Sequence, residues 1–498
     1  MKATIIFIYA CLTPVIAWSD EEVILDLSAP HHSFPHFWEQ MFGSGRAILT
    51  LRDSYRRDLR EVKKATDFKF VRFHAILHDE VGIYDEDKHG NPIYNFSYVD
   101  QIYDGLLDNG VRPFVELSFM PRKLASREVV QSFKYHPIVA PPRDYAKWDA
   151  LISTFAAHLI ERYGIDEVAH WYFEVWNEPN LEFWAGTPAQ ATYWTLYDHT
   201  ARALKKVNAR LRVGGPSTAQ AAWVGAFIRH AADKDVPLDF ISTHVYANDT
   251  SKDVFATHEA IPRTEMVCRA AKKVRDEVKS SPRPDVPIIW SEYNATYFND
   301  PKITDSLFMG PWLADTVRRC DGLADMMSYW TFSDVFEEQG VVRRPFYGGF
   351  GLIAAGGVPK PAFNAFKMLH QLGVERLEVA SEHALVTRRT DGSLVIALWN
   401  YVSPGESGLP TTIFLRLPHE ARSARLLRLD ADHGDVGGEY ARMGSPPYPT
   451  RAQLDVLIKA SALPAPEDLA IVNERVSVTL PPNGLATVEV LSGATGGR

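Results

Sequence analysis

The chain of 498 residues contains only three cysteines. Three cysteines cannot form a disulfide framework for a chain of this length, and cysteine and histidine nowhere show a metal-binding spacing, so we expect no metal and no cofactor. Cys11 lies in an N-terminal segment that we expect to be removed. Cys268 and Cys320 lie in helix-like stretches, which predicts buried free thiols, with a disulfide between them as the alternative.

Runs of positive charge are also missing. Lysine and arginine total 53 against 62 aspartates and glutamates, a formal net charge of −9, and no basic stripe occurs. This charge pattern argues against nucleic acid as a partner and favours a neutral or weakly charged ligand. The 12 tryptophans and 20 tyrosines suit the flat faces of sugars as well as a large core. The sequence carries no signal for an oligomeric state.

Long apolar runs are absent after the N-terminus, so we expect no membrane-spanning segment. At the N-terminus, Lys2 precedes an apolar run over residues 5–16, and Val15–Ala17 resembles a small-residue cleavage site. This pattern predicts a signal peptide over residues 1–18 and a secreted or periplasmic protein. A lipoprotein cleavage box ending at Cys11 is the alternative, but Tyr9 matches it poorly.

From about residue 65 to residue 370, short apolar runs alternate with longer amphipathic ones. Helices are expected over 145–163, 189–208 and 264–279, and eight candidate strands lie near residues 42–44, 68–73, 111–117, 171–176, 212–215, 238–242, 287–290 and 327–330. Such alternation is typical of an α/β fold with a parallel sheet covered by helices. Eight units, with no glycine-rich dinucleotide loop after the first strand, predict a (β/α)₈ TIM barrel over residues 36–372.

After residue 372 the helical pattern disappears. Runs of β type at 394–399, 412–417, 475–480 and 486–491 are separated by turns such as Asp391-Gly392. They predict a C-terminal antiparallel β-sandwich over residues 373–493. A strand expected at 23–27, within residues 19–35, is a candidate to join this sandwich, and residues 494–498 form a disordered tail.

Two glutamates follow predicted barrel strands. Glu178 stands in Asn177-Glu178-Pro179, after the fourth strand, and Glu292 ends the seventh. An isolated Asn-Glu-Pro would equally suit the start of a helix. Here it follows a strand of aromatic residues, and the C-terminal ends of barrel strands carry active sites. Strands four and seven face each other across the mouth, so we expect the two carboxyls to form the pair that glycoside hydrolysis requires.

The sequence resembles glycoside hydrolase family 39, which contains β-xylosidases and α-L-iduronidases. The resemblance covers nearly the whole chain and is carried by the segments Gly43–Ala47, Phe70–His74, Glu116–Pro121, Asn177–Leu181 and Ser328–Glu338. It implies a retaining enzyme with Glu178 as general acid/base and Glu292 as nucleophile.

The resemblance also implies roles around this pair. Asn177 and His74 would bind ring hydroxyls, His244 would line the sugar site, and Tyr246 would hydrogen-bond the nucleophile. As isolated residues the two histidines would be assigned to the core, but both end strands at the catalytic face. We expect Arg72 to hold the carboxylates in place and Phe119 to support the site. Trp330 is either a platform for the sugar or a plug of the barrel, and we favour the platform.

The substrate class is indicated by Glu337 and Glu338, in the loop after the eighth strand. In the xylosidase branch this position binds the far hydroxyls of the sugar, whereas an iduronidase must receive a carboxylate, which two glutamates would repel. We therefore predict a β-xylosidase that releases terminal xylose. Tyr293 departs from that branch, so other specificities of the family remain as alternatives, as does a non-catalytic carbohydrate-binding barrel.

Overall fold

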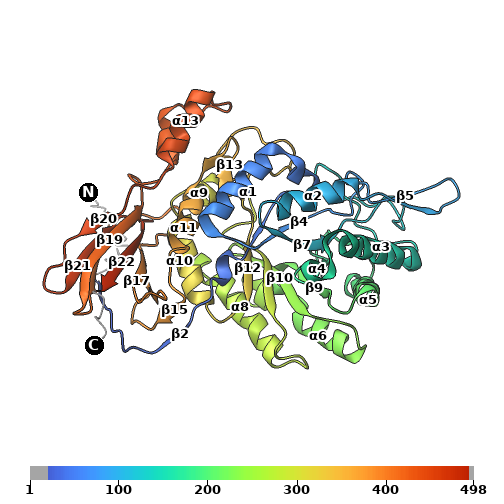
Figure 1. Cartoon of the computed structure of the whole chain (residues 1–498), viewed down its shortest axis with the longest axis horizontal. Coiled ribbons are helices and arrows are strands. Elements are labelled where there is room, and N and C mark those ends of the chain that lie inside the picture. The colour runs from blue at the N-terminus through green and yellow to red at the C-terminus, as the bar shows by residue number, and fades with distance from the viewer. Residues whose placement is uncertain (1–20, 493–498) are drawn as a thin grey trace, which may run out of the picture.

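Eight parallel strands close into a barrel, as predicted, in the computed structural model, which describes residues 21–492 (Figure 1). In barrel order the strands are β3 (Met41–Gly43), β4 (Phe70–Phe73), β7 (Arg112–Leu117), β8 (Tyr172–Val175), β9 (Arg212–Thr218), β10 (Phe240–Tyr246), β11 (Ile288–Asn294) and β12 (Met326–Tyr329). β12 pairs with β3 and completes the ring. All eight candidate strands of the sequence analysis are present, and the predicted barrel fold is confirmed.

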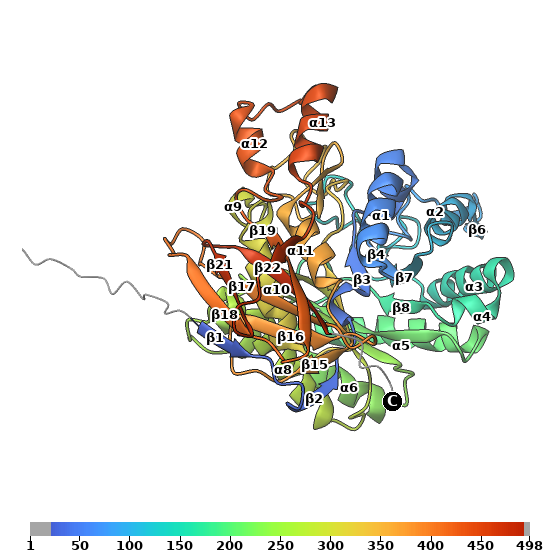
Figure 2. The same cartoon turned by 60° about the vertical axis from the view of Figure 1, so that its left-hand side comes forward.

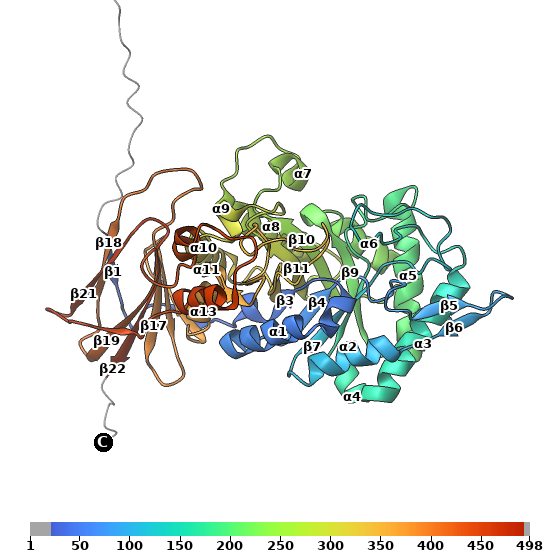
Figure 3. The ribbon, with the colours of Figure 1, turned by 90° about the horizontal axis from the view of Figure 1, so that it is seen from above.

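Helices surround the barrel on its outer side (Figure 3). They are α1 (Asp53–Thr66), α2 (Ser97–Leu107), α3 (Tyr145–Tyr163), α4 (Ile165–Val168), α5 (Ala189–Val207), α6 (Val224–Asp233), α7 (Ser251–Phe255), α8 (Arg263–Lys279), α9 (Pro301–Thr304), α10 (Met309–Cys320) and α11 (Pro361–Leu369). Local chemistry sets their ends: Asp144 caps α3 by accepting from two backbone N–H groups, and Gly164 ends it with φ 78°. Short 3₁₀ turns occur at η1 (Phe37–Glu39), η2 (Ala47–Leu51) and η3 (Ala219–Ala221), and two small hairpins pair β5 (Tyr84–Glu86) with β6 (Pro92–Tyr94) and β13 (Ile353–Ala354) with β14 (Val358–Pro359).

Two further sheets form the sandwich, on the left in Figure 1. The larger has seven strands in the order β2 (His31–Ser33), β15 (Glu375–Leu377), β16 (Ala384–Arg388), β17 (Leu394–Trp399), β22 (Leu485–Ser492), β19 (Ala421–Leu429) and β20 (Glu467–Leu469), and the smaller has β1 (Glu21–Ile24), β18 (Thr411–Arg416) and β21 (Arg475–Leu480). All pairs are antiparallel except β1 with β18.

The burial of the sandwich strands explains their sequence patterns. β21 alternates exposed and buried residues because only one face packs on the core between the two sheets. β17 is buried along its whole length, since Ile396 and Leu398 face the smaller sheet while Val395 and Ala397 join the core of the barrel. The larger sheet therefore attaches the sandwich to the barrel through α10 and α11.

The C-terminal region also contains helices that the sequence analysis did not expect. Between β19 and β20 the chain forms α12 (Gly437–Arg442) and α13 (Arg451–Ala460), which project beside each other away from the sheets (Figure 2). Tyr440 and Leu457 pack on Val358 and Phe346 in a small separate core. The prediction that the region after residue 372 has almost no helix was wrong, because these helices of 6 and 10 residues bury few side chains and are too short for a helical period to stand out in the sequence.

Cys268 on α8 and Cys320 on α10 form a disulfide. The expectation of free thiols is thereby corrected. The two helices are neighbours on the barrel surface although the cysteines are 52 residues apart in sequence, and helical periodicity does not report that proximity. Across residues 21–492, no helix has the length and apolar character needed to cross a membrane. The predicted signal peptide and C-terminal tail lie outside the described residues.

Candidate active site

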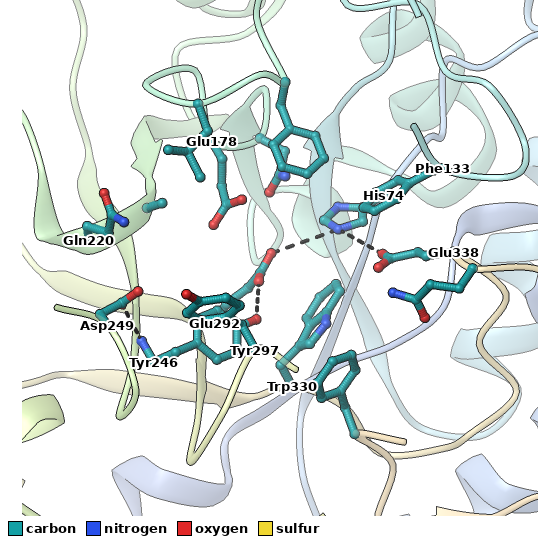
Figure 4. Close-up of a pocket in the computed structure, with 16 residues that line it drawn as sticks. His74, Phe133, Glu178, Gln220, Tyr246, Asp249, Glu292, Tyr297, Trp330 and Glu338 are labelled. Atoms are coloured by element: carbon teal, nitrogen blue, oxygen red, sulfur yellow. Dashed lines mark hydrogen bonds and ion pairs between the residues drawn. The ribbon is translucent and has the colours of Figure 1, made fainter. Parts of the chain in front are cut away.

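A cavity of about 340 Å³ opens at the mouth of the barrel, where the parallel strands end (Figure 4). Glu178, Gln220 and Asp249 lie on one side of it in this view, and His74, Phe133 and Glu338 on the other. Its full lining is His74, Phe133, Asn177, Glu178, Leu181, Phe183, Ala219, Gln220, Tyr246, Asp249, Glu292, Tyr297, Trp330, Glu338, Gln339 and Phe350.

Glu292 enters the cavity from β11 and is held on both carboxylate oxygens. Arg72 donates from Nη1 to Oε1 at 2.6 Å, and the hydroxyl of Tyr246 donates to Oε2 at 2.6 Å. Only 4% of Glu292 is exposed. A carboxylate with two fixed donors keeps one orientation, so its oxygens are presented to the cavity in a defined geometry.

Glu178 faces Glu292 from the turn that follows β8. This residue adopts the left-handed region with φ 43°, and its backbone N–H is bound by the carbonyl of Ser217 at 2.7 Å. Oε1 of Glu178 lies 3.0 Å from Nδ1 of His244. One carboxylate oxygen of Glu178, one of Glu292 and a ring nitrogen of His244 all lie within 4.8 Å of one another.

The two carboxyls have different surroundings. Burial, together with the nearby charges of Glu292 and Asp249, raises the pKa of Glu178 well above its usual range. No arginine contacts the Glu178 carboxyl among the described hydrogen bonds and ion pairs, whereas Arg72 binds Glu292 directly. A carboxyl with a raised pKa therefore lies opposite a carboxyl that Arg72 binds, and this asymmetry suits the division into acid and nucleophile that chemistry at a sugar requires.

Arg72 lies beneath the cavity, fully buried, and connects the strands that carry the site. Besides Glu292, its guanidinium donates to Glu174 at 2.6 Å and to Oδ1 of Asn177 at 2.9 Å, and it forms an ion pair with Glu116 at 2.8 Å. Because Arg72 occupies Oδ1, the Asn177 side chain presents its amide N–H groups to the cavity. Glu116 and Glu174 were part of the predicted strands, but the sequence analysis gave them no role.

His74 and Glu338 close the far end of the cavity. Nδ1 of His74 donates to Glu116 at 2.6 Å, and its Nε2 faces Oε1 of Glu338 at 3.6 Å. Burial lowers the pKa of His74, but the charge of Glu116, the hydrogen bond to it and the charge of Glu292 together outweigh this effect, so the pKa is raised overall. Burial raises the pKa of Glu338 to about 8.

The structure separates the predicted pair Glu337 and Glu338. Glu338 lines the cavity, whereas the Glu337 carboxylate accepts two hydrogen bonds from Arg52, at 2.5 and 3.0 Å, and lies 3.6 Å from Arg46. The chain turns at this point, with the N–H of Gly340 bound by the carbonyl of Glu337, and the two adjacent acids point to different partners, so only Glu338 faces the cavity. Glu337 instead anchors the loop that presents Glu338.

Trp330 and Phe119 occupy different depths. Trp330 lines the cavity while only 3% exposed, so it forms part of its floor, and stacking of a sugar on its ring stays a prediction. Its ring requires Gly43, since a Cβ there would lie 2.1 Å from Cε3 of Trp330. Phe119 does not line the cavity; it packs behind it against Trp176 and Phe183.

Several lining residues were not predicted. Asp249 accepts a hydrogen bond from the backbone N–H of Tyr246 at 2.8 Å, and burial raises its pKa to about 7. Gln220, Tyr297 and Phe133 come from loops rather than strand ends. The position of Asp249 three residues after Tyr246 was the available signal, because loops at this face of a barrel carry substrate contacts.

Two groups of side chains within residues 21–492 have the spacing and donor atoms for a metal ion. One consists of Glu178, His244 and Glu292 and coincides with the carboxyl pair. The other consists of His36, Glu39 and His370 and lies outside the cavity.

Comparisons with known proteins agree with this geometry. The family model for glycosyl hydrolases family 39 matches residues 22–471. A β-xylosidase from Geobacillus stearothermophilus is 38% identical over 440 residues, 86% of each chain, and one from Caldicellulosiruptor saccharolyticus is 36% identical over 86% of this chain and 88% of its own. The crystal structure of a monomeric β-xylosidase from Caulobacter crescentus CB15 superposes with a TM-score of 0.86 at 31% identity, covering 95% of this chain and all of that one. The chain therefore belongs to glycosyl hydrolases family 39 and is an O-glycosyl hydrolase.

Proposed function

We propose that the protein is a retaining β-xylosidase that releases terminal xylose, with Glu178 as general acid/base and Glu292 as nucleophile. The observation that carries this proposal is the short distance across the cavity between a carboxyl with a raised pKa and a carboxylate held by Arg72 and Tyr246. Retaining glycosidases hold their carboxyls about 5 to 5.5 Å apart, while inverting enzymes leave a wider gap for a water molecule.

The reaction then proceeds in two displacements. Glu292 attacks the anomeric carbon and forms a glycosyl ester, while Glu178 gives its proton to the departing glycosidic oxygen. In the second step, water attacks the same carbon, Glu178 takes a proton from that water, and the Glu292 carboxylate leaves. Burial and the charge of Glu292 both raise the pKa of Glu178, and because the ester carries no charge, the second cause disappears after the first step; the pKa then falls and Glu178 becomes better able to act as a base.

The charge of the cavity supports a neutral sugar as substrate. Its lining contains four carboxyl side chains, Glu178, Asp249, Glu292 and Glu338, and no described lining residue is lysine or arginine. A uronic acid would bring a fifth carboxyl group, and His74, the lining side chain that can carry a positive charge, is already paired with Glu116 and Glu338, so the added charge costs free energy. The pentose xylose carries no such group.

The size of the cavity supports removal of single terminal residues. A volume of about 340 Å³ is near the lower end of the range for ligand pockets. Trp330 closes the floor, and His74 with Glu338 closes the far end, so the non-reducing sugar has no room to continue into a longer chain. Asn177, His74 and Glu338 present hydrogen-bonding groups to its hydroxyls.

A panel of nitrophenyl glycosides tests the substrate. We expect kcat/KM to be highest for the β-xyloside and lowest for the glucuronide and iduronide, with the Glu292→Gln variant as the inactive control for contaminating hydrolases. An NMR time course should show β-xylose as the first product. A preference for a uronide, or α-xylose appearing first, would contradict the proposal.

Export of the protein is a separate proposal, which rests on Lys2 and the apolar run over residues 5–16. The disulfide between Cys268 and Cys320 supports it, because disulfides persist in oxidising compartments outside the cytosol. N-terminal sequencing of the protein recovered from its native host should show cleavage close to residue 18. Recovery of a chain that still begins at Met1 from the cytosol would contradict it.

A further inference from the structure

The chain crosses between sandwich and barrel twice, and the two crossings run side by side. The first leads from β2 to η1, and the second from α11 to β15. β2 pairs with β15, and the N–H of Phe34 is bound by the carbonyl of Val374 at 2.7 Å. At this junction His36 and Glu39 from the first crossing meet His370 from the second.

The three side chains converge on one carboxylate oxygen. Oε1 of Glu39 lies 2.6 Å from Nδ1 of His36 and 2.8 Å from Nδ1 of His370. Only 3% of Glu39 is exposed, and its second oxygen, Oε2, is buried with no hydrogen-bond partner among the described residues. A buried carboxylate with an unused oxygen is costly unless a cation compensates it.

The contact on the other side of the His36 ring determines which ring nitrogen carries a hydrogen. Nε2 of His36 lies 3.2 Å from the carbonyl of Leu372, which only accepts, so Nε2 carries a hydrogen. In the neutral imidazole, Nδ1 then presents a lone pair to Glu39 Oε1. Two electron-rich atoms at that distance require a hydrogen or a metal ion between them: a second proton on the ring, a proton on Glu39, or a bound ion.

We propose that His36, Glu39 and His370 bind a divalent transition-metal ion, with Zn²⁺ as the best match. Two imidazoles and one carboxylate suit zinc, and a histidine ligand that donates its other N–H to a backbone carbonyl is the usual arrangement around bound metals. Tetrahedral zinc with bonds of about 2.0 to 2.2 Å spaces its ligands about 3.3 Å apart. The His36 and His370 nitrogens therefore need to move only slightly away from Glu39.

Access to the site and its position indicate a structural ion. The His370 side chain is 40% exposed, so metal enters from solvent on that side, and water completes the coordination. Glu39 lies two residues before the first residue of β3, at the N-terminal end of the barrel, whereas the cavity lies at the C-terminal ends of the strands. The ion would fasten the two crossings together. Sequence spacing does not reveal the site, because His370 is 331 residues from Glu39.

Zinc binding to the untagged, chelator-treated full chain tests this proposal. Calorimetric titration with ZnCl₂ should show one ion per chain, and zinc should raise the midpoint of thermal unfolding. The variant H370Q removes a partly exposed ligand and should weaken the fitted Kd by at least about tenfold, since changing even a residue that only contacts a metal ligand typically costs about 10- to 100-fold. H199Q is the matched control, since His199 is a similarly exposed histidine paired with Asp149.

A second control tests whether zinc binds instead at the carboxyl pair, where the candidate ligands Glu178, His244 and Glu292 include a single histidine. E178Q should leave zinc binding unchanged, and X-ray absorption at the zinc edge of the wild-type protein, which needs no variant, should report two imidazoles per ion. The proposal is overturned if wild-type protein shows no saturable binding. It is equally overturned if H370Q binds zinc normally, if E178Q abolishes binding, or if one imidazole is found.

Discussion

Nδ1 of His244 lies 3.0 Å from Oε1 of Glu178, and the other side of the imidazole determines which of these two atoms carries the proton. Ser291 donates its hydroxyl hydrogen to Glu174 at 2.6 Å, so its oxygen accepts from Nε2 of His244 at 3.1 Å. Burial lowers the pKa of His244 well below its usual range, which keeps the ring neutral. Nδ1 is then an acceptor, and Glu178 must be the donor. This chain of hydrogen bonds from Glu178 through His244 and Ser291 to Glu174, called the relay below, therefore favours protonated Glu178.

We predict that Ser291→Ala moves the basic limb of the pH profile of kcat/KM to lower pH. Without the serine acceptor, the ring can place its hydrogen on Nδ1 and donate to ionised Glu178, which lowers the pKa of this acid. Activity requires protonated Glu178, so the basic limb follows that pKa downwards. A hydrogen bond contributes on the order of 1 kcal/mol, which corresponds to a shift of about half to one pH unit.

Ser328→Ala is the matched control for that shift. Ser328 is a fully buried serine on the barrel strand β12, and its hydroxyl has no partner among the described residues. Ser328→Ala should leave the basic limb of the pH profile at the pH of the wild type. If the basic limb shifts equally in both variants, or does not shift in Ser291→Ala, the relay does not set the protonation of Glu178.

A second pH effect is expected at Glu338, where burial raises the pKa to about 8. Below that pH the carboxyl is neutral and donates a hydrogen bond to the sugar; above it, the carboxylate repels Glu292 and this donor is lost. KM for the nitrophenyl xyloside should therefore rise as the pH increases through 8. Glu338→Gln retains a donor and an acceptor, so its KM should stay low and independent of pH.

Glu338→Ala is the comparison for that variant, because it removes both hydrogen-bonding groups. We expect kcat/KM to fall about tenfold, as the loss of roughly 1.4 kcal/mol predicts. A KM of the Gln variant that rises with pH as in the wild type would show that Glu338 is not the titrating group.

Much of the barrel and its site could be predicted from the sequence because the signals are local. Parallel barrel strands are buried on both sides and read as apolar runs, so β8 and β11 could be located. The residue that follows such a strand necessarily reaches the mouth, which placed Glu178 and Glu292 in one cavity. Tyr246, which ends β10, could be placed by the same reasoning with help from the family resemblance, whereas Arg72 lies inside β4 and its role was expected from its charge within the family motif.

Other features depend on contacts between distant segments, which local patterns do not report. Glu337 and Glu338 are chemically identical, and only the path of the loop shows which of them Arg52 holds. The pairing of Cys268 with Cys320 depends on α8 lying beside α10. α13 was missed because its ten residues are fewer than the stretch over which a helical period can be recognised reliably, and only Leu457 is buried in it.

The disulfide leads to a prediction about stability. It closes a loop of 52 residues, which reduces the entropy of the unfolded chain and stabilises the fold by about 2 to 4 kcal/mol. Cys268→Ala combined with Cys320→Ala should lower the midpoint of thermal unfolding. kcat/KM should stay unchanged, because both cysteines lie on outer helices away from the cavity. An unaltered midpoint, with the wild-type disulfide verified by thiol titration, would contradict this.

The last prediction concerns the two carboxyls and separates their roles. Glu178→Ala should still form the glycosyl-enzyme from nitrophenyl xyloside, since nitrophenolate leaves without a proton, but it lacks the base for the second step. Azide needs no base, so it should restore turnover and give β-xylosyl azide. Glu292→Ala cannot form the glycosyl ester and should give no β-azide.

Xylobiose provides the control for that experiment, because its departing sugar needs a proton that the Glu178 variant cannot supply. Azide should therefore fail to restore cleavage of xylobiose by Glu178→Ala, while it restores cleavage of the nitrophenyl substrate. NMR of the azide product identifies its anomer, and the anomer reports the face of attack: attack on the ester at Glu292 gives β, whereas direct attack from the side of a missing nucleophile gives α. β-Azide from Glu292→Ala, or α-azide from Glu178→Ala, would show that the two roles are reversed.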